Sequence, residues 1–150
     1  MLTIHAADLV VGGAGELKDG AVVVDGARIA AVGSLAELTE RFPGARVRRW
    51  PGVLGPGLVH EGPLPDAPSP RERVHAVLKR GVTAVLAADV DSAGLRGAAE
   101  RGGVSVVAGA RSSAGLGEGE RADLAVFAEA HGVGEAVATV CGGRLVHRRR

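Results

Sequence analysis

The middle of the chain alternates short apolar runs with helical patterns, and this alternation restricts the available folds more than any other feature. Apolar runs at 53–59, 82–88 and 104–108 are typical of strands that are buried on both faces. Helical patterns at 69–81 and 92–101 lie between these runs. Helices between consecutive strands favour parallel pairing with right-handed crossovers. The segment therefore predicts a βαβαβ unit.

Both ends of the chain carry strand patterns instead. Near the N-terminus, Asp25-Gly26 lies between the two apolar halves of 21–32, which is a strong hairpin signal because glycine tolerates a positive φ. A closing hairpin is predicted at 136–147, around Gly142-Gly143. A further strand is predicted at 47–50, separated from the run at 53–59 by Pro51-Gly52. The predicted order along the chain is therefore β-rich, then α/β, then β-rich.

Three glycines after the first strand pattern, Gly12, Gly13 and Gly15, do not form a phosphate-binding loop. Such a loop must lead from a strand into a helix, so that the backbone amides of the helix face the anion. Here the next pattern, 20–24, is again typical of a strand. We therefore expect no nucleotide site at these glycines.

Composition and charge argue against several kinds of partner. Only Phe42, Trp50 and Phe127 are aromatic, so the core must be aliphatic, and stacking on nucleic-acid bases is not expected. Eighteen basic against seventeen acidic residues give a formal net charge of +1, which provides no field for nucleic acid or an anionic membrane. Cys141 is the only cysteine, and no apolar stretch approaches the roughly 20 residues of a membrane span. We expect a cytoplasmic protein without nucleic-acid or membrane partners.

Several motifs, in the same order along the chain, resemble the amidohydrolase superfamily. DGARIAAVG at 25–33 and PGLV at 56–59 resemble the opening of imidazolonepropionases and related deaminases. RGVTAVLAADV at 80–90 is similar to the second barrel strand of that family. GEGERADLAVF at 117–127 and VATVCGGRLV at 137–146 resemble its closing segment. The resemblance covers most of the chain.

This resemblance implies a mixed α/β fold in which both ends of the chain form a β-sandwich-like composite domain. That domain would comprise residues 1–52 and 117–150. Residues 53–116 would hold a truncated βαβαβ remnant of a (β/α)8 barrel and a connecting loop. A complete barrel takes about 250 residues, and at least roughly 200, so the resemblance implies a chain without most of its barrel.

The metal chemistry of the family is altered as well. The resemblance places a His-x-His metal pair just after the PGLV-like strand, at positions that are Gly62 and Leu64 in this chain. Neither side chain can bind a metal ion. Asp123, in the ADL motif, belongs to the sandwich by the same resemblance and is not the catalytic aspartate of the family. We therefore predict no cofactor.

Polar residues after the predicted parallel strands form the candidate site, because ligands bind at the carboxyl ends of such strands. The catalytic candidates are His60, Glu61, Asp89 and Asp91, and the substrate-binding candidates are Arg111, Ser112 and Ser113. A histidine beside carboxylates could act as a general base, or the group could hold a divalent metal such as zinc. The alternative is that these are loop residues and helix caps, with Asp91 or Ser92 capping the next helix.

Two functions follow from these observations. In the first, the protein has lost the metal-dependent hydrolase site and acts as a binding or accessory module, with a small molecule as one candidate ligand. In the alternative, it is a hydrolase or deaminase that acts on a carbon–nitrogen, non-peptide bond of a heterocyclic substrate at a rebuilt site. Because an incomplete barrel leaves sheet edges and an apolar face open, we also predict a homodimer.

Overall fold

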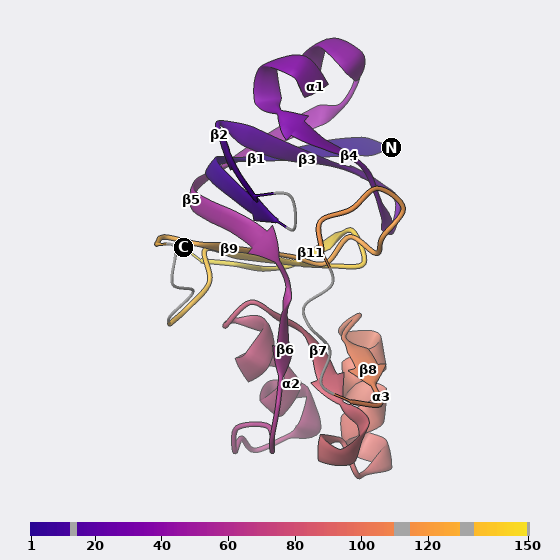
Figure 1. Ribbon diagram of the computed structural model, residues 1–150. Coiled ribbons are helices and arrows are strands. Elements are labelled where there is room, and N and C mark those ends of the chain that lie inside the picture. Colours follow the sequence, from indigo (N-terminus) through magenta and orange to yellow (C-terminus); the bar gives the residue numbers. More distant parts are fainter. Residues whose placement is uncertain (13–14, 110–114, 130–133, 150) are drawn as a thin grey trace.

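The computed structural model describes residues 1–12, 15–109, 115–129 and 134–149. These residues form a mixed α/β fold with one large mixed sheet, one small parallel sheet and three α-helices, and they include no closed barrel. Figure 1 shows the large sheet above the small parallel unit, with both chain ends in the large sheet. The predicted fold class is therefore confirmed.

The large sheet combines strands from both ends of the chain. Its order is β11-β10-β9-β5-β1-β3-β4, with β2 paired to β1. The bounds are β1 Leu2–Gly12, β2 Gly15–Lys18, β3 Gly20–Asp25, β4 Arg28–Ser34, β5 Arg46–Pro56, β9 Leu124–Phe127, β10 Ala138–Cys141 and β11 Arg144–Arg148. Both predicted hairpins, β3-β4 and β10-β11, are confirmed. The sequence did not predict β2, whose four residues are all exposed.

The strand β5 corrects one prediction. Its sequence indicated a break at Pro51-Gly52, but the strand continues through these residues to Pro56. Its parallel pairing with β1 shifts register between Ala7 and Leu9, which is the signature of a β-bulge. Gly52 adopts φ +99°, and its N–H donates to Asp8 Oδ2 at 2.9 Å. A side chain from the neighbouring strand thus satisfies the backbone group that the bulge frees.

The large sheet folds over onto itself as a sandwich, with β1, β3 and β4 in one layer and β9 to β11 in the other (Figure 1). Its core contains residues of both layers, among them Val22, Leu54, Leu124 and Val140, each at most 1% exposed. The helix α1 (Leu35–Arg41) covers the outer face of the first layer, where Leu38 packs against a separate cluster of small apolar residues.

The parallel unit follows β5 directly. It consists of β6 (Leu58–His60), α2 (Pro70–Leu78), β7 (Val82–Leu86), the short 3-10 helix η1 (Ala87–Asp89), α3 (Ala93–Arg101) and β8 (Ser105–Val107). The strand order is β6-β7-β8, and both pairings are parallel, so the predicted βαβαβ unit is confirmed. Its first strand is shorter than the predicted 53–59, because residues 53–56 belong to β5 and pair with β9 in the large sheet. Among the described helices, none is both long and apolar enough to cross a membrane.

Serine side chains cap both helices of the parallel unit. Ser69 Oγ accepts from the N–H of Glu72 at 3.2 Å, and Pro70 occupies the first turn of α2, where its missing N–H costs nothing. Ser92 Oγ accepts from the N–H of Leu95 at 3.1 Å in the same way. Local sequence signals therefore place the beginnings of both helices.

The outer face of the second sandwich layer packs on the parallel unit. Thr139 Oγ1 donates to the Leu78 carbonyl at 2.7 Å, and the N–H of Ala136 donates to the Lys79 carbonyl at 2.7 Å. Gly81 lies so close to Phe127 that a Cβ at this glycine would come within 2.6 Å of the ring. The two parts of the molecule therefore share a close-packed junction.

Candidate functional site

The loops at the carboxyl ends of β6 and β7 meet, as parallel pairing of these strands requires. Asp89, at the end of η1, accepts the N–H of Gly62 on Oδ2 at 2.9 Å. His60, the last residue of β6, places Nε2 at 3.1 Å from the carbonyl oxygen of Pro63. Two of the four predicted catalytic residues thus lie at this edge of the sheet, and each side chain is engaged with the backbone of the loop that follows β6.

The other two catalytic candidates do not join His60 and Asp89 in a common site. Glu61 and Asp91 are exposed, and neither makes an ion pair within the described part of the chain. Ser92, not Asp91, caps α3, which decides between the two capping residues considered from the sequence. The substrate-binding candidates Arg111, Ser112 and Ser113 fall outside the described residues.

The two positions that the resemblance assigns to a metal-binding pair do not fit a metal ion. Leu64 is 2% exposed and packs in the apolar core of the parallel unit with Val74 and Leu95. Gly62 adopts φ +90°, a backbone conformation that residues with a side chain rarely adopt. Over the described ranges, no group of three or more His, Cys, Asp and Glu side chains is arranged to hold a metal. The donor set that a divalent ion would need is absent from these residues.

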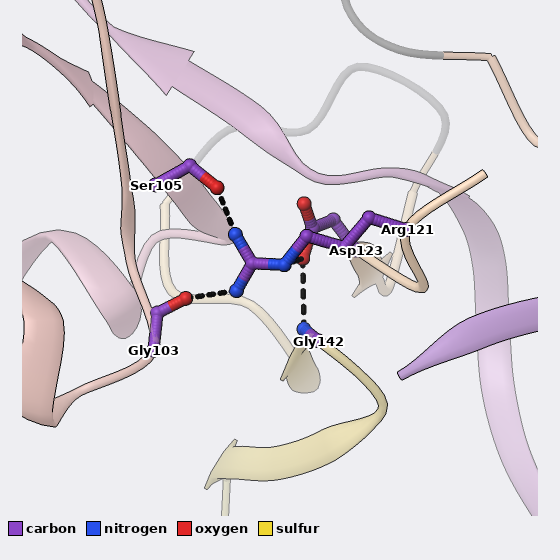
Figure 2. A network of polar contacts seen from close by, with 5 residues as sticks. All are labelled: Gly103, Ser105, Arg121, Asp123 and Gly142. Atoms are coloured by element: carbon purple, nitrogen blue, oxygen red, sulfur yellow. Dashed lines mark hydrogen bonds and ion pairs between the residues drawn. The ribbon is translucent and has the colours of Figure 1, made fainter. Parts of the chain in front are cut away.

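The most extensive polar network in the described molecule lies at the junction instead (Figure 2). The guanidinium of Arg121 donates to Ser105 Oγ and to the carbonyl of Gly103, and its Nε lies 3.4 Å from Asp123 Oδ1. The same carboxylate oxygen accepts the N–H of Gly142 at 2.9 Å. Arg121 therefore joins the region around β8 to the sandwich, with Asp123 and the β10-β11 turn on the sandwich side.

Asp123 has a structural role, in keeping with its expected place in the sandwich. Burial raises the pKa of this carboxyl group, while the Gly142 N–H and the Arg121 guanidinium oppose that shift. The ADL motif can be recognised in the sequence, whereas the role of Arg121, two residues earlier, cannot. The only available signal was the charge of Arg121 beside a buried strand, and its partners Gly103 and Ser105 are brought to it by the tertiary fold.

Two other buried titratable groups are unsuited to catalysis. Burial raises the pKa of Cys141 to about 12, and the nearby Asp123 carboxylate adds to the effect, so the thiol is not a nucleophile near neutral pH. Burial lowers the pKa of His5 to about 4, helped by Arg48. His5 Nδ1 accepts the indole N–H of Trp50 at 3.1 Å, which requires the neutral ring. Both residues contribute to packing.

Comparison with known proteins places these features in a family context. Residues 20–45 match the family model described as imidazolonepropionase-like composite domain, bacteria. This segment contains the β3-β4 hairpin and α1 of the sandwich. The predicted resemblance to an imidazolonepropionase-like composite domain is therefore confirmed over these residues. No curated protein matches the chain in sequence.

Solved structures match the fold over most of this chain but over a minor part of their own length. An ochratoxinase from A. niger is 24% identical with a TM-score of 0.51, covering 70% of this chain and 30% of its own. An adenosine deaminase from Xanthomonas campestris, solved with bound zinc, is 23% identical with a TM-score of 0.53, covering 70% and 33%. E. coli guanine deaminase is 16% identical with a TM-score of 0.54, covering 69% and 35%. At these identities the likeness concerns the fold, and the chain spans about a third of the length of these structures.

Proposed function

We propose that this chain is an amidohydrolase-like protein that lacks the metal-dependent hydrolase site of its relatives and acts as a binding or accessory module. The observation that carries the proposal is the burial of Leu64. At the position of the second family histidine, this side chain is 2% exposed and is part of the core between the sheet and its helices. The residue is a structural component of the unit.

The surroundings of Leu64 support the same conclusion. A polar imidazole in this apolar core would lose its hydration without gaining a partner, which costs a protein several kcal/mol in unfavourable cases. The backbone N–H of Gly62 and the carboxylate of Asp89 are already paired with each other. A metal site here would require a ligating side chain in place of Gly62 and repacking of the core around position 64. It would also require Asp89 to give up its hydrogen bond with the Gly62 N–H.

Elemental analysis of protein never exposed to chelator or nickel resin tests this proposal. We expect far less than one zinc, iron or manganese per folded chain. A tightly bound ion at about one per chain would overturn the proposal. A matched variant sharpens the test: Leu64→His should unfold at lower denaturant concentration and should not acquire stoichiometric zinc, whereas Leu64→Met should stay close to the parent in stability.

One observation favours the second candidate, a hydrolase or deaminase that acts on a carbon–nitrogen bond of a heterocyclic substrate. His60 and Asp89 lie on loops that meet at one edge of the parallel sheet, where ligands bind in such units. If this candidate is right, the purified chain hydrolyses or deaminates a panel of purines, pyrimidines and hydantoins, and His60→Ala and Asp89→Ala each abolish turnover. Glu100→Ala, at an exposed position of α3 outside the candidate set, serves as the control.

A further inference from the structure

A groove between α2 and α3 lies on the helical face of the parallel unit, apart from the strand-end site. It encloses about 220 Å³ and is lined by Arg71, Val74, His75, Leu78, Ala98, Arg101 and Gly102. None of these residues belongs to the candidate catalytic set or to the Arg121 network. The helices that form it pack against each other, so its two walls are held by the core of the unit.

The floor of the groove is apolar and belongs to that core. Val74, Leu78 and Ala98 are 3%, 5% and 5% exposed, respectively. Such a floor offers a surface to a short hydrocarbon or ring but cannot hydrogen-bond it. The polar contacts of any ligand must therefore come from the rim.

The rim is cationic. Arg71, His75 and Arg101 all border the groove. In the described part of the chain, no carboxylate lies within 4.0 Å of the charged nitrogens of Arg71 or Arg101, since the ion pairs found there involve Arg121 and His147. Glu72 lines an adjoining hollow with Ser69, Arg71 and His75, and the His147–Glu135 pair lies on the far side of His75, whose ring meets that of His147 edge-on. Two arginines and a histidine thus border the groove, and within the described residues neither arginine is paired with a carboxylate.

The position of Arg101 depends on a glycine that the helix would otherwise disfavour. Gly97 lies inside α3, where glycine is less favourable than alanine. A Cβ at Gly97 would come within 3.0 Å of Arg101 Nη1, so the guanidinium lies in the space that the missing side chain leaves. Arg101 is thus folded back along α3, and a Cβ at Gly97 would push its guanidinium outward.

We propose that this groove binds a small organic anion with a short apolar body and one carboxylate or phosphate group. The body packs on Val74, Leu78 and Ala98, and the anionic group lies between Arg71 and Arg101, where guanidinium groups recognise planar or tetrahedral oxyanions. Because the lining residues differ from those of the strand-end site, this inference stands or falls independently of the proposed loss of hydrolase chemistry.

Titrations followed by ¹H–¹⁵N NMR of the purified chain test the proposal, with hexanoate, hexyl phosphate, uncharged hexanamide and inorganic phosphate as probes. We expect saturable shifts at amides of α2 and α3 with at least one of the two organic anions, and binding about tenfold weaker for hexanamide. The stronger of the two anions identifies the head group. Shifts that do not saturate, shifts outside α2 and α3, or equal binding of hexanamide or of inorganic phosphate would overturn the proposal.

Three variants and one control test whether the anion binds in the groove. Arg71→Gln and Arg101→Gln should each weaken binding of the preferred anion about tenfold, because each removes one guanidinium. Gly97→Ala should weaken it as well while favouring the helix, since the new Cβ displaces Arg101. Arg46→Gln, at an exposed position of β5 in the sandwich, should leave binding unchanged. Equal binding by all four variants would contradict the assignment of the groove.

Discussion

The sandwich and the parallel unit of this molecule bury their sheets in different ways. The sandwich folds one eight-stranded sheet around a core that both layers share. The parallel unit has three strands, and β6 and β8 form its two edges, with Leu58 and Val106 37% and 38% exposed. It completes its burial against the sandwich, whose residue Cys141 is part of its core. The smaller unit therefore depends on the larger one.

The largest effect is expected in the core of the sandwich. Leu54, on β5, is 0% exposed between the two layers, so Leu54→Ala should lower the free energy of unfolding by about 2–5 kcal/mol. Urea unfolding followed by circular dichroism measures this loss. If the parallel unit depends on the sandwich, helical signal and Trp50 fluorescence should be lost together. Leu17→Ala, at a side chain 39% exposed, is the control and should change stability little.

The second expected effect is a pH dependence of stability that comes from His5, on β1 of the sandwich. Because the pKa of His5 is about 4 in the folded protein against 6.5 for the free side chain, the unfolded chain binds the proton more readily. The contribution of His5 to stability is therefore complete above pH 6.5 and is lost as the pH falls towards 4, by about 3 kcal/mol in total.

Trp50, the only tryptophan, donates to His5 and reports this change directly by its fluorescence. Urea midpoints measured between pH 7 and pH 4.5 should fall in the parent. In His5→Asn, whose side-chain oxygen can accept the same indole N–H without titrating, the fall should be smaller. Identical pH profiles for the two proteins would show that His5 does not control this part of the stability.

A smaller effect is expected at the junction. Thr139 is 0% exposed and donates to the Leu78 carbonyl, so Thr139→Val leaves a buried acceptor without its partner at a cost of about 1–3 kcal/mol. Hydrogen exchange should accelerate in α2 and β7 more than in β1 and β3. Thr39→Val, which removes a hydroxyl bonded within α1 at a partly exposed position, is the matched control. Uniform acceleration across both parts would contradict a junction-specific role.

The smallest effect on the free energy of unfolding is expected from substitutions that disrupt the predicted dimer. Edge strands with unpaired backbone groups favour association unless charged side chains protect them. Light scattering at micromolar concentration should give twice the mass of 15.1 kDa for the parent. Leu58→Lys combined with Val106→Lys should give the monomer with little change in unfolding. A monomeric parent would refute the prediction.

The local elements could be predicted because their signals lie within a few residues. Asp25-Gly26 predicts the β3-β4 hairpin, and the helical patterns predicted from residues 69 and 92 begin at serines that cap α2 and α3. β5 was divided wrongly, because the bulge at Gly52 is held by Asp8, which is 44 residues away in sequence. Short-range patterns contain no information about such a partner.

The candidate site could be predicted only in part. Parallel pairing of β6 and β7 brings His60 and Asp89 to one edge of the sheet, as the strand order implied. The resemblance assigns the metal-binding pair to the positions of Gly62 and Leu64, and the structure shows that Leu64 is buried in the core of the parallel unit. The sequence did not show that Asp89 is already occupied by a backbone N–H, nor that Arg121 joins the two parts of the molecule.

By itself, the sequence determined the succession of β-rich and α/β segments, the two hairpin turns and the helices of the parallel unit, because each depends on residue type and short-range geometry. Only the tertiary structure decided which groups meet across long separations: Trp50 with His5, Gly52 with Asp8, and Arg121 with Gly103. The physical reason is that a buried polar group must find a partner wherever the packed chain supplies one, and the chain position of that partner is set by the packing of the sheets.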